Sequence, residues 1–196
     1  MPKTTFGKLP QEKKDRVLAA ATDLFAGRGF HRTEMDEIAR QAGVSKGSLY
    51  NYFKSKDELF LYICNTGIQG FRETVWREIS PPLDIYQQVD ELFRRQVPLI
   101  LAHPQNFQIY LNLASSGMRR FADRYTQKGE EFGAQRLKAL LEEGRTRGIV
   151  RRDLDVSHMA FLIHSLSLIF MASLVSPHFQ IRFKEYLGIH GKLDSK

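Results

Sequence analysis

The sequence contains one cysteine, Cys64, among its 196 residues, so no disulfide can form within the chain. This composition favours a reducing, intracellular setting. The N-terminal stretch lacks the apolar segment of a secretory signal. The longest apolar run, residues 159–175, is interrupted by His164 and three serines, and it falls short of the ~20 residues that a membrane-spanning helix needs. We therefore expect a cytoplasmic protein without a membrane partner.

Sequence patterns of catalytic and metal sites are also missing. The six histidines show neither HExxH nor any other metal-ligand spacing, and there is no glycine-rich phosphate-binding loop. Cys64 follows Ile63 on an expected helix, which favours packing over a nucleophilic role. We therefore predict no catalytic residue, no metal and no cofactor, and we do not expect an enzyme.

Alternating β-branched residues with hairpin turns are absent, whereas apolar residues recur at helical spacing along the chain. This pattern predicts an all-α protein. Gly27 and Gly29 are expected to end the first helix, and the Thr33 hydroxyl is expected to cap the second. The expected helices, about nine in number, cover residues 11–29, 33–43, 46–52, 56–79, 83–102, 106–115, 119–147, 156–176 and 179–187.

Acidic residues are missing from residues 38–56, although this window carries four basic side chains in a chain of net charge +7. Two short expected helices flank Gly43, and a tight glycine-containing turn between two helices is typical of a helix-turn-helix. That motif places its second helix, here residues 46–52, in the major groove of DNA. The alternative interpretation is that this short polar helix is ordinary solvated surface.

The expected second helix carries groups suited to DNA contact. Glycine lets the backbone approach closely, hydroxyls can bind phosphate oxygens, and lysines neutralise phosphates. Leu49 and Phe53 are expected to point inward and hold the helix in place. The predicted DNA-contacting residues are Ser45, Lys46, Gly47, Ser48, Tyr50, Tyr52 and Lys56.

Residues of defined identity and spacing form one pattern across the first three expected helices and the start of the fourth. They are Val17, Leu18, Ala20, Ala21, Leu24, Phe25, Gly29, Phe30, Thr33, Ile38, Ala39, Ala42, Gly43, Val44, Ser45, Lys46, Gly47, Leu49, Tyr50, Tyr52, Phe53, Lys56 and Leu59. This pattern resembles the N-terminal pattern of the TetR family of bacterial transcriptional regulators. The resemblance covers about residues 10–60 and implies that Thr33 and Asn51 also contact DNA. Glu34 departs from the pattern, because the family often has a threonine there and a carboxylate would repel phosphate.

The resemblance implies an all-α homodimer. An N-terminal three-helix helix-turn-helix DNA-binding head, residues 1–55, would precede a larger helical ligand-binding and dimerisation domain, residues 56–196. It also implies three partners: a palindromic double-stranded DNA operator, a second copy of the chain and an unidentified small-molecule effector that releases the operator. The expected function is a ligand-responsive transcriptional regulator, and a repressor is expected rather than an activator.

The C-terminal two-thirds are less specific. The helix expected over residues 156–176 is apolar on nearly all sides, so it should be buried. A partner subunit is the simplest explanation for this burial, and the alternative is that it is the central helix of a monomer. Ligand sites are mostly apolar with a few polar groups, so an apolar or amphipathic effector is expected. Its candidate contacts, each of which could instead be plain core, are Trp76, Phe107, Tyr110, Phe121 and His164.

A second function remains open at this point. The chain could be a small-molecule-binding helical protein whose head no longer reads DNA specifically. Glu34 is the sequence feature that favours this alternative.

Overall fold

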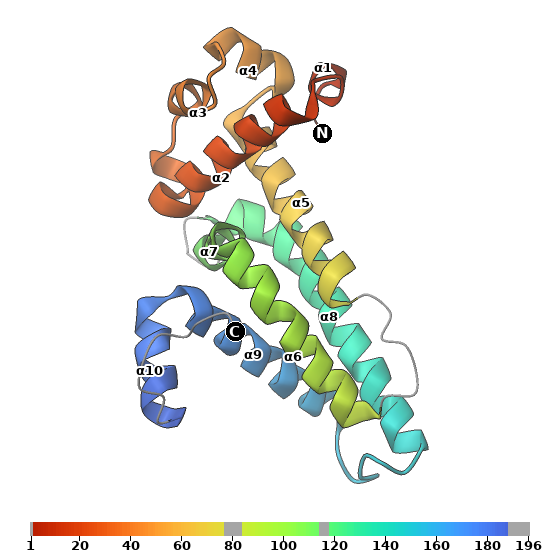
Figure 1. The fold of residues 1–196 in the computed structure, drawn as a ribbon. Helices are drawn as coiled ribbons and strands as arrows, with labels where there is room; N and C mark the ends of the chain where they lie inside the picture. The colour runs from red at the N-terminus through yellow and green to blue at the C-terminus, as the bar shows by residue number, and fades with distance from the viewer. Residues whose placement is uncertain (1, 77–83, 114–117, 188–196) are drawn as a thin grey trace. The chain divides into compact units, whose positions relative to one another are not determined.

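The computed structural model describes residues 2–76, 84–113 and 118–187, and all regular structure within these ranges is helical, which confirms the predicted all-α class. The helices follow one another as shown in Figure 1. They are α1 (Thr4–Gly7), α2 (Gln11–Arg32), α3 (Met35–Gln41), α4 (Lys46–Tyr52), α5 (Lys56–Val75), α6 (Ile85–Ala102), α7 (Pro104–Leu113), α8 (Arg119–Thr146), α9 (Val156–Val175) and α10 (Pro177–Leu187).

Most helix boundaries follow from the local sequence. Asp84 caps α6 by accepting from the Gln87 N–H, while the Gln87 side chain accepts from the Asp84 N–H, a reciprocal capping box. Pro104 and Pro177 open α7 and α10, whereas the sequence placed both starts two residues later. Proline is favoured at the first helical position because the N–H that it lacks would be unpaired there. The predicted end of α5 near Ile79 lies outside the described residues.

The junction between α2 and α3 differs from the prediction. Gly29 interrupts α2 with a φ of 77°, as its glycine predicts. The predicted capping role of Thr33 is wrong, because Glu34 stands at the N-cap of α3. The Thr33 hydroxyl instead lies 3.1 Å from the Leu24 carbonyl oxygen and 2.9 Å from that of Gly29, and it closes the end of α2.

The chain divides into two compact units. The head unit comprises Met1–Gln69 and Gln108–Tyr125, and the second unit comprises Gly70–Phe107 and Thr126–Lys196. Helices α5 and α8 each begin in the head unit and end in the second unit. The predicted boundary between residues 55 and 56 separates a DNA-binding part of the sequence from a ligand-binding and dimerisation part. This functional division stays a prediction.

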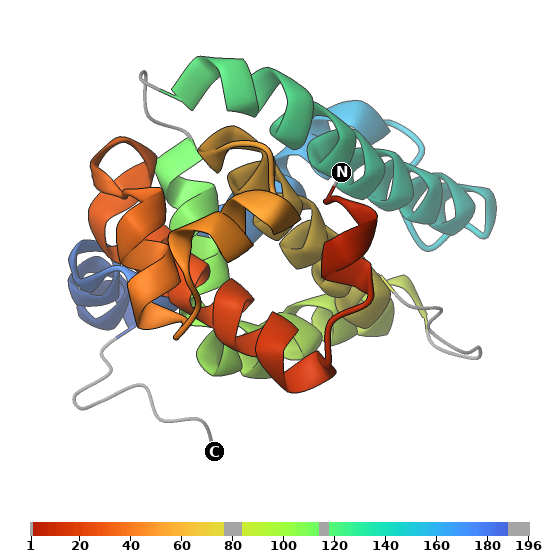
Figure 2. The same cartoon turned by 90° about the horizontal axis from the view of Figure 1, so that it is seen from above.

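The head unit has an aromatic core. Helix α3 packs against α2 and α4, and α1 packs against α4 (Figure 2). The Phe60 ring centroid lies 5.0 Å from that of Phe25, and 5.1 Å from those of Phe30 and Phe121. These contacts hold α2 on α5 and on the start of α8.

The second unit has its own core, in which α6 packs against α9 and α9 against α10. One buried polar pair joins two of these helices, since the Ser167 hydroxyl donates to Gln96 Oε1 at 2.9 Å. The buried apolar residues of this core are Val75, Ile85, Leu92, Leu137, Leu141, Val150, Val156 and Ala160.

Gly144 on α8 gives a stability prediction for the second unit. A Cβ at this position would lie 2.7 Å from Ile85 Cδ1 and 2.9 Å from Val150 Cγ2. Overpacking costs about 1–3 kcal/mol, whereas alanine gains about 1 kcal/mol over glycine inside a helix. We expect Gly144→Ala to lower the free energy of unfolding by about 1 kcal/mol in urea denaturation followed by circular dichroism.

Gly70 on α5 is the matched control. A Cβ added there meets no heavy atom within 4 Å, so Gly70→Ala is expected to raise the free energy of unfolding by up to about 1 kcal/mol. If both alanine substitutions raise the free energy of unfolding equally, Ile85 and Val150 do not lie as close to Gly144 as described.

Candidate nucleic-acid interface and effector site

The turn between α3 and α4 has the geometry of a helix-turn-helix. Gly43 adopts a φ of 67°, which lets the chain reverse after α3. The Val44 N–H then donates to the Ala39 carbonyl at 2.9 Å. The Ser45 side chain accepts from the Ser48 N–H at 3.1 Å, which confirms Ser45 as the cap of α4. Gly43 and Ser45 therefore determine where the turn lies and where α4 begins.

Helix α4 has a buried side and an exposed side. Leu49 and Phe53 are fully buried, as predicted, and they anchor the helix in the head core. Ser48 is half-buried, so its hydroxyl, 2.8 Å from that of Ser45, lies at the edge of the exposed side. The predicted DNA-contacting residues exposed on or beside α4 are Ser45, Lys46, Gly47, Tyr50 and Asn51.

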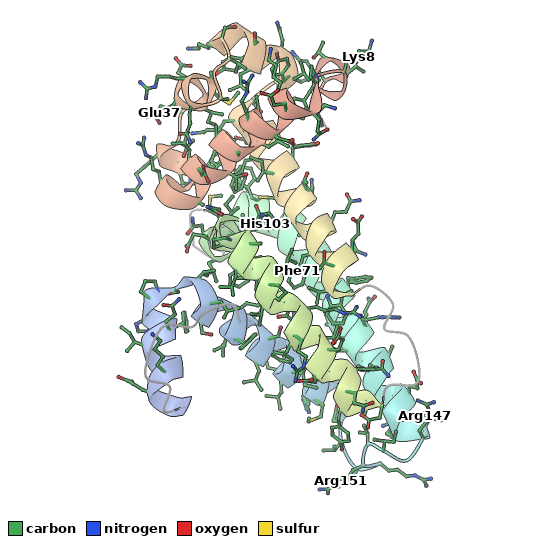
Figure 3. The ribbon with its side chains drawn as sticks, viewed as in Figure 1. Lys8, Glu37, Phe71, His103, Arg147 and Arg151 are labelled. Atoms are coloured by element: carbon green, nitrogen blue, oxygen red, sulfur yellow. The ribbon has the colours of Figure 1, made fainter. Side chains whose placement is uncertain are left out.

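The exposed Lys46 already has an anionic partner. Its Nζ lies 2.8 Å from Asp36 Oδ2 on α3, and both side chains are largely exposed. The hydrogen bond from Lys46 and the charge of Asp36 raise the pKa of the lysine above its ordinary value. A neighbouring acid, Glu37 on the outer side of α3 (Figure 3), pairs with Arg28 at 2.8 Å. DNA phosphate would therefore compete with Asp36 for Lys46, a feature that the acid-free window did not reveal.

Three predicted contact residues have side chains that contact other residues of the head unit. Thr33 is fully buried, and its hydroxyl is directed to two backbone carbonyls of α2. Tyr52 is 6% exposed because its ring packs on Phe6, with centroids 5.9 Å apart. Lys56 Nζ donates to the Thr33 carbonyl at 2.7 Å and lies 4.7 Å from the centroid of the Phe30 ring. These contacts give the three side chains packing roles, and their contact with DNA stays a prediction.

Removal of the Asp36 carboxylate is expected to strengthen DNA binding. Asp36→Asn frees Lys46 for phosphate and removes one negative charge from the same surface. Exposed ion pairs are weak because water screens them, so the affinity should rise by no more than about fivefold, for operator and random duplex alike. Fluorescence anisotropy with both duplexes at low salt measures the change.

Asp90 provides the control, because it forms an exposed pair with Arg94 on α6 of the second unit. Asp90→Asn is expected to leave DNA affinity unchanged. Equal gains in the two variants would indicate an effect of net charge alone.

The candidate effector residues fall into two groups. Trp76 and His164 come together in the second unit, since a Cβ at Gly133 would lie 3.4 Å from His164 Nε2 and 3.5 Å from Trp76 Cζ2. Phe121 and Tyr110 instead belong to the core of the head unit, with Phe121 2% exposed. Phe107 is buried in the second unit. Sequence spacing could not separate these groups.

Two residues beside Trp76 were missed by the sequence. The Phe132 ring stands edge-on to Trp76 with centroids 6.2 Å apart. The exposed Arg72 places its guanidinium carbon 3.8 Å from the centroid of the Phe132 ring. Aromatic faces beside a guanidinium suit a ligand with an apolar part and an anionic part.

No group of three or more histidine, cysteine or acidic side chains that could hold a metal occurs within the described ranges.

Helix α9 exposes a large apolar face. Its length and mean hydropathy of 1.8 would allow it to cross a membrane, although the core helix of a soluble protein meets the same criteria. Scattered exposed apolar residues are ordinary, but a contiguous set marks an interaction surface. The exposed residues of this face are Phe161, Leu162, Leu166 and Ile169, and Ile181 is exposed on α10.

Comparison with known proteins gives matches in sequence. A family model described as bacterial regulatory proteins of the tetR family matches residues 17–63. Bacillus subtilis YfiR, named an uncharacterized HTH-type transcriptional regulator, is 31% identical over 154 residues, which cover 72% of this chain and 71% of YfiR. YhgD of Bacillus subtilis, also named an uncharacterized HTH-type transcriptional regulator, is 27% identical over 160 residues. These cover 81% of this chain and 83% of YhgD.

Solved structures match the fold over most of the chain. A TetR family transcriptional regulator from Chloroflexus aurantiacus has a TM-score of 0.70 at 24% identity, covering 95% of this chain and 88% of that one. FadR of Bacillus subtilis, solved with stearoyl-CoA, has a TM-score of 0.68 at 22% identity, covering 89% and 98%. AibR, solved with isovaleryl coenzyme A and operator DNA, has a TM-score of 0.63 at 20% identity, covering 84% and 86%.

Proposed function

Because this chain belongs to the TetR family of bacterial transcriptional regulators, we propose that it is a ligand-responsive repressor that binds a palindromic operator as a dimer. The exposed side of α4 carries the proposal. A capped helix whose Leu49 and Phe53 are buried presents Lys46, Tyr50 and Asn51 on its open side. A lysine can neutralise phosphate, a tyrosine can donate to phosphate, and an asparagine can bind an adenine edge.

The dimer is supported by the apolar face of α9. A twofold axis beside this helix would bury the face against its own copy, because an isologous interface uses the same patch on both subunits. Two heads related by such an axis would read half-sites about 34–36 Å apart, one turn of the duplex, and the operator would share the twofold symmetry.

The effector is proposed to be an anionic amphiphile that contacts Trp76, Phe132 and His164 in the second unit. Arg72 beside Phe132 would pair with its anionic part. Coenzyme A thioesters are the first class to test, since FadR and AibR, which share the fold, were solved with them. A ligand that binds the operator-free form more tightly would shift the population away from DNA.

A gel shift with the DNA upstream of the protein's own gene tests this function. We expect a specific complex at low salt that dissociates when stearoyl-CoA is added, with free coenzyme A as the control. Trp76 is the single tryptophan of the chain, so its fluorescence reports ligand binding directly.

Two results would count against the proposal in different ways. The absence of a specific band would favour the small-molecule-binding protein whose head no longer reads DNA. A specific band with no change in band or fluorescence across acyl-CoA chain lengths would retain DNA binding but overturn this effector class.

A further inference from the structure

The C-terminal end of α4 leaves three backbone carbonyls without partners inside the helix. The last helical bond runs from the Phe53 N–H to the Leu49 carbonyl at 3.0 Å. The carbonyls of Tyr50, Asn51 and Tyr52 lie beyond that bond, as the final carbonyls of any α-helix do. A helix of seven residues has little intrinsic stability, so the way in which this end is closed matters for its shape.

The N-terminal segment closes all three carbonyls. The Lys3 backbone N–H donates to the Tyr52 carbonyl at 3.0 Å, and the Lys3 ammonium donates to the Tyr50 carbonyl at 3.0 Å. The Thr5 hydroxyl donates to the Asn51 carbonyl at 2.6 Å. Because Lys3 is cationic, it also offsets the partial negative charge at the end of the helix.

A buried aromatic side chain fixes this segment in place. Phe6 on α1 is 2% exposed, although it lies only a few residues from the described start of the chain. Its ring centroid lies 4.8 Å from that of Phe53 and 5.7 Å from that of Tyr62. Residues 3–6 are thus packed into the head core rather than resting on its surface.

This segment lies outside the part of the chain that the family model matches, which begins at residue 17. We propose that residues 3–6 form a brace that holds the end of the recognition helix α4 in its DNA-binding conformation. Lys3, Thr5 and Phe6 are positioning residues in this proposal, since they act through Tyr50 and Asn51. The effect on operator affinity rests on the proposed function, whereas the effect on α4 itself does not.

Thr5 allows a conservative test, because its side chain is exposed and its replacement leaves the core intact. Thr5→Val removes the hydroxyl with little change in shape, and Thr5→Ser retains it. We expect Thr5→Val to weaken operator binding about threefold, the loss typical of one deleted hydrogen bond, and Thr5→Ser to bind like the wild type. Neither substitution changes charge, so the salt dependence of binding should stay the same.

Hydrogen exchange of the DNA-free protein separates the brace from direct DNA contact. The brace predicts faster amide exchange at residues 50–53 in Thr5→Val and wild-type exchange in Thr5→Ser, since the last turn of α4 opens more often. Unchanged exchange in Thr5→Val, or equal changes in both variants, would overturn the proposal whatever the operator result. Faster exchange in Thr5→Val alone would support it even if no operator is found.

Discussion

The substitution Leu166→Asp is expected to convert the proposed dimer to a monomer and to abolish operator binding. Leu166 is 60% exposed in the single chain and lies with Phe161, Leu162 and Ile169 on the apolar face of α9. A twofold interface would bury one new carboxylate from each subunit, and each unpaired buried charge costs about 3 kcal/mol or more. The two charges together cost about 6 kcal/mol or more, so the dimer dissociation constant should rise at least about 10,000-fold. Analytical ultracentrifugation at micromolar concentration measures the change.

Tyr86 provides the control for this prediction. It is 69% exposed on α6 and also lies in the second unit, but it is not part of the α9 face. Tyr86→Asp is expected to remain dimeric and to bind the operator like the wild type. A wild-type protein that sediments as a monomer, or a Leu166→Asp variant that stays dimeric, would contradict the assignment of this face.

Lys46→Ala and Tyr50→Ala are each expected to weaken operator binding by about tenfold to a hundredfold. Both side chains are exposed, so neither substitution should lower the thermal unfolding temperature of the protein. The two variants should differ in salt dependence. The slope of log K against log salt should fall by about 1 for Lys46→Ala, which loses a charge, and stay constant for Tyr50→Ala.

Lys138, an exposed lysine on α8, controls for the loss of one positive charge elsewhere in the chain. Lys138→Ala is expected to keep the operator affinity of the wild type within about twofold, because it removes charge without removing a predicted phosphate contact. Wild-type binding by both Lys46→Ala and Tyr50→Ala would show that α4 is not the recognition helix.

The parts of the fold that the sequence predicted are those with local signals. Apolar spacing identified the longer helices, and Gly43 with Ser45 identified the turn and the start of α4. Leu49 and Phe53 were placed inside correctly because they lie on the apolar side of a short helix with a known start.

The features that the sequence missed depend on contacts between distant residues. Helix α1 has four residues and no periodic pattern, and its place is set by contacts with α4 more than forty residues along the chain. The partner of Lys46 is Asp36, ten residues earlier on another helix. Phe121 looked like a ligand contact by composition, whereas the fold brings it to Phe30 and Phe60.

Disulfide cross-linking tests most directly whether α4 lies in a DNA groove. Asn51→Cys places an exposed thiol on α4, and the operator carries a thiol tethered to one base. The native Cys64 does not interfere, because burial raises the pKa of its thiol to about 12 and the thiolate is the reactive form.

Lys138→Cys in the second unit serves as the control for the cross-linking reaction. If α4 is the recognition helix, position 51 should cross-link to one operator base in each half-site, and position 138 should not cross-link. Efficient linkage from position 138, or none from position 51 to any base of a bound operator, would contradict this assignment of α4.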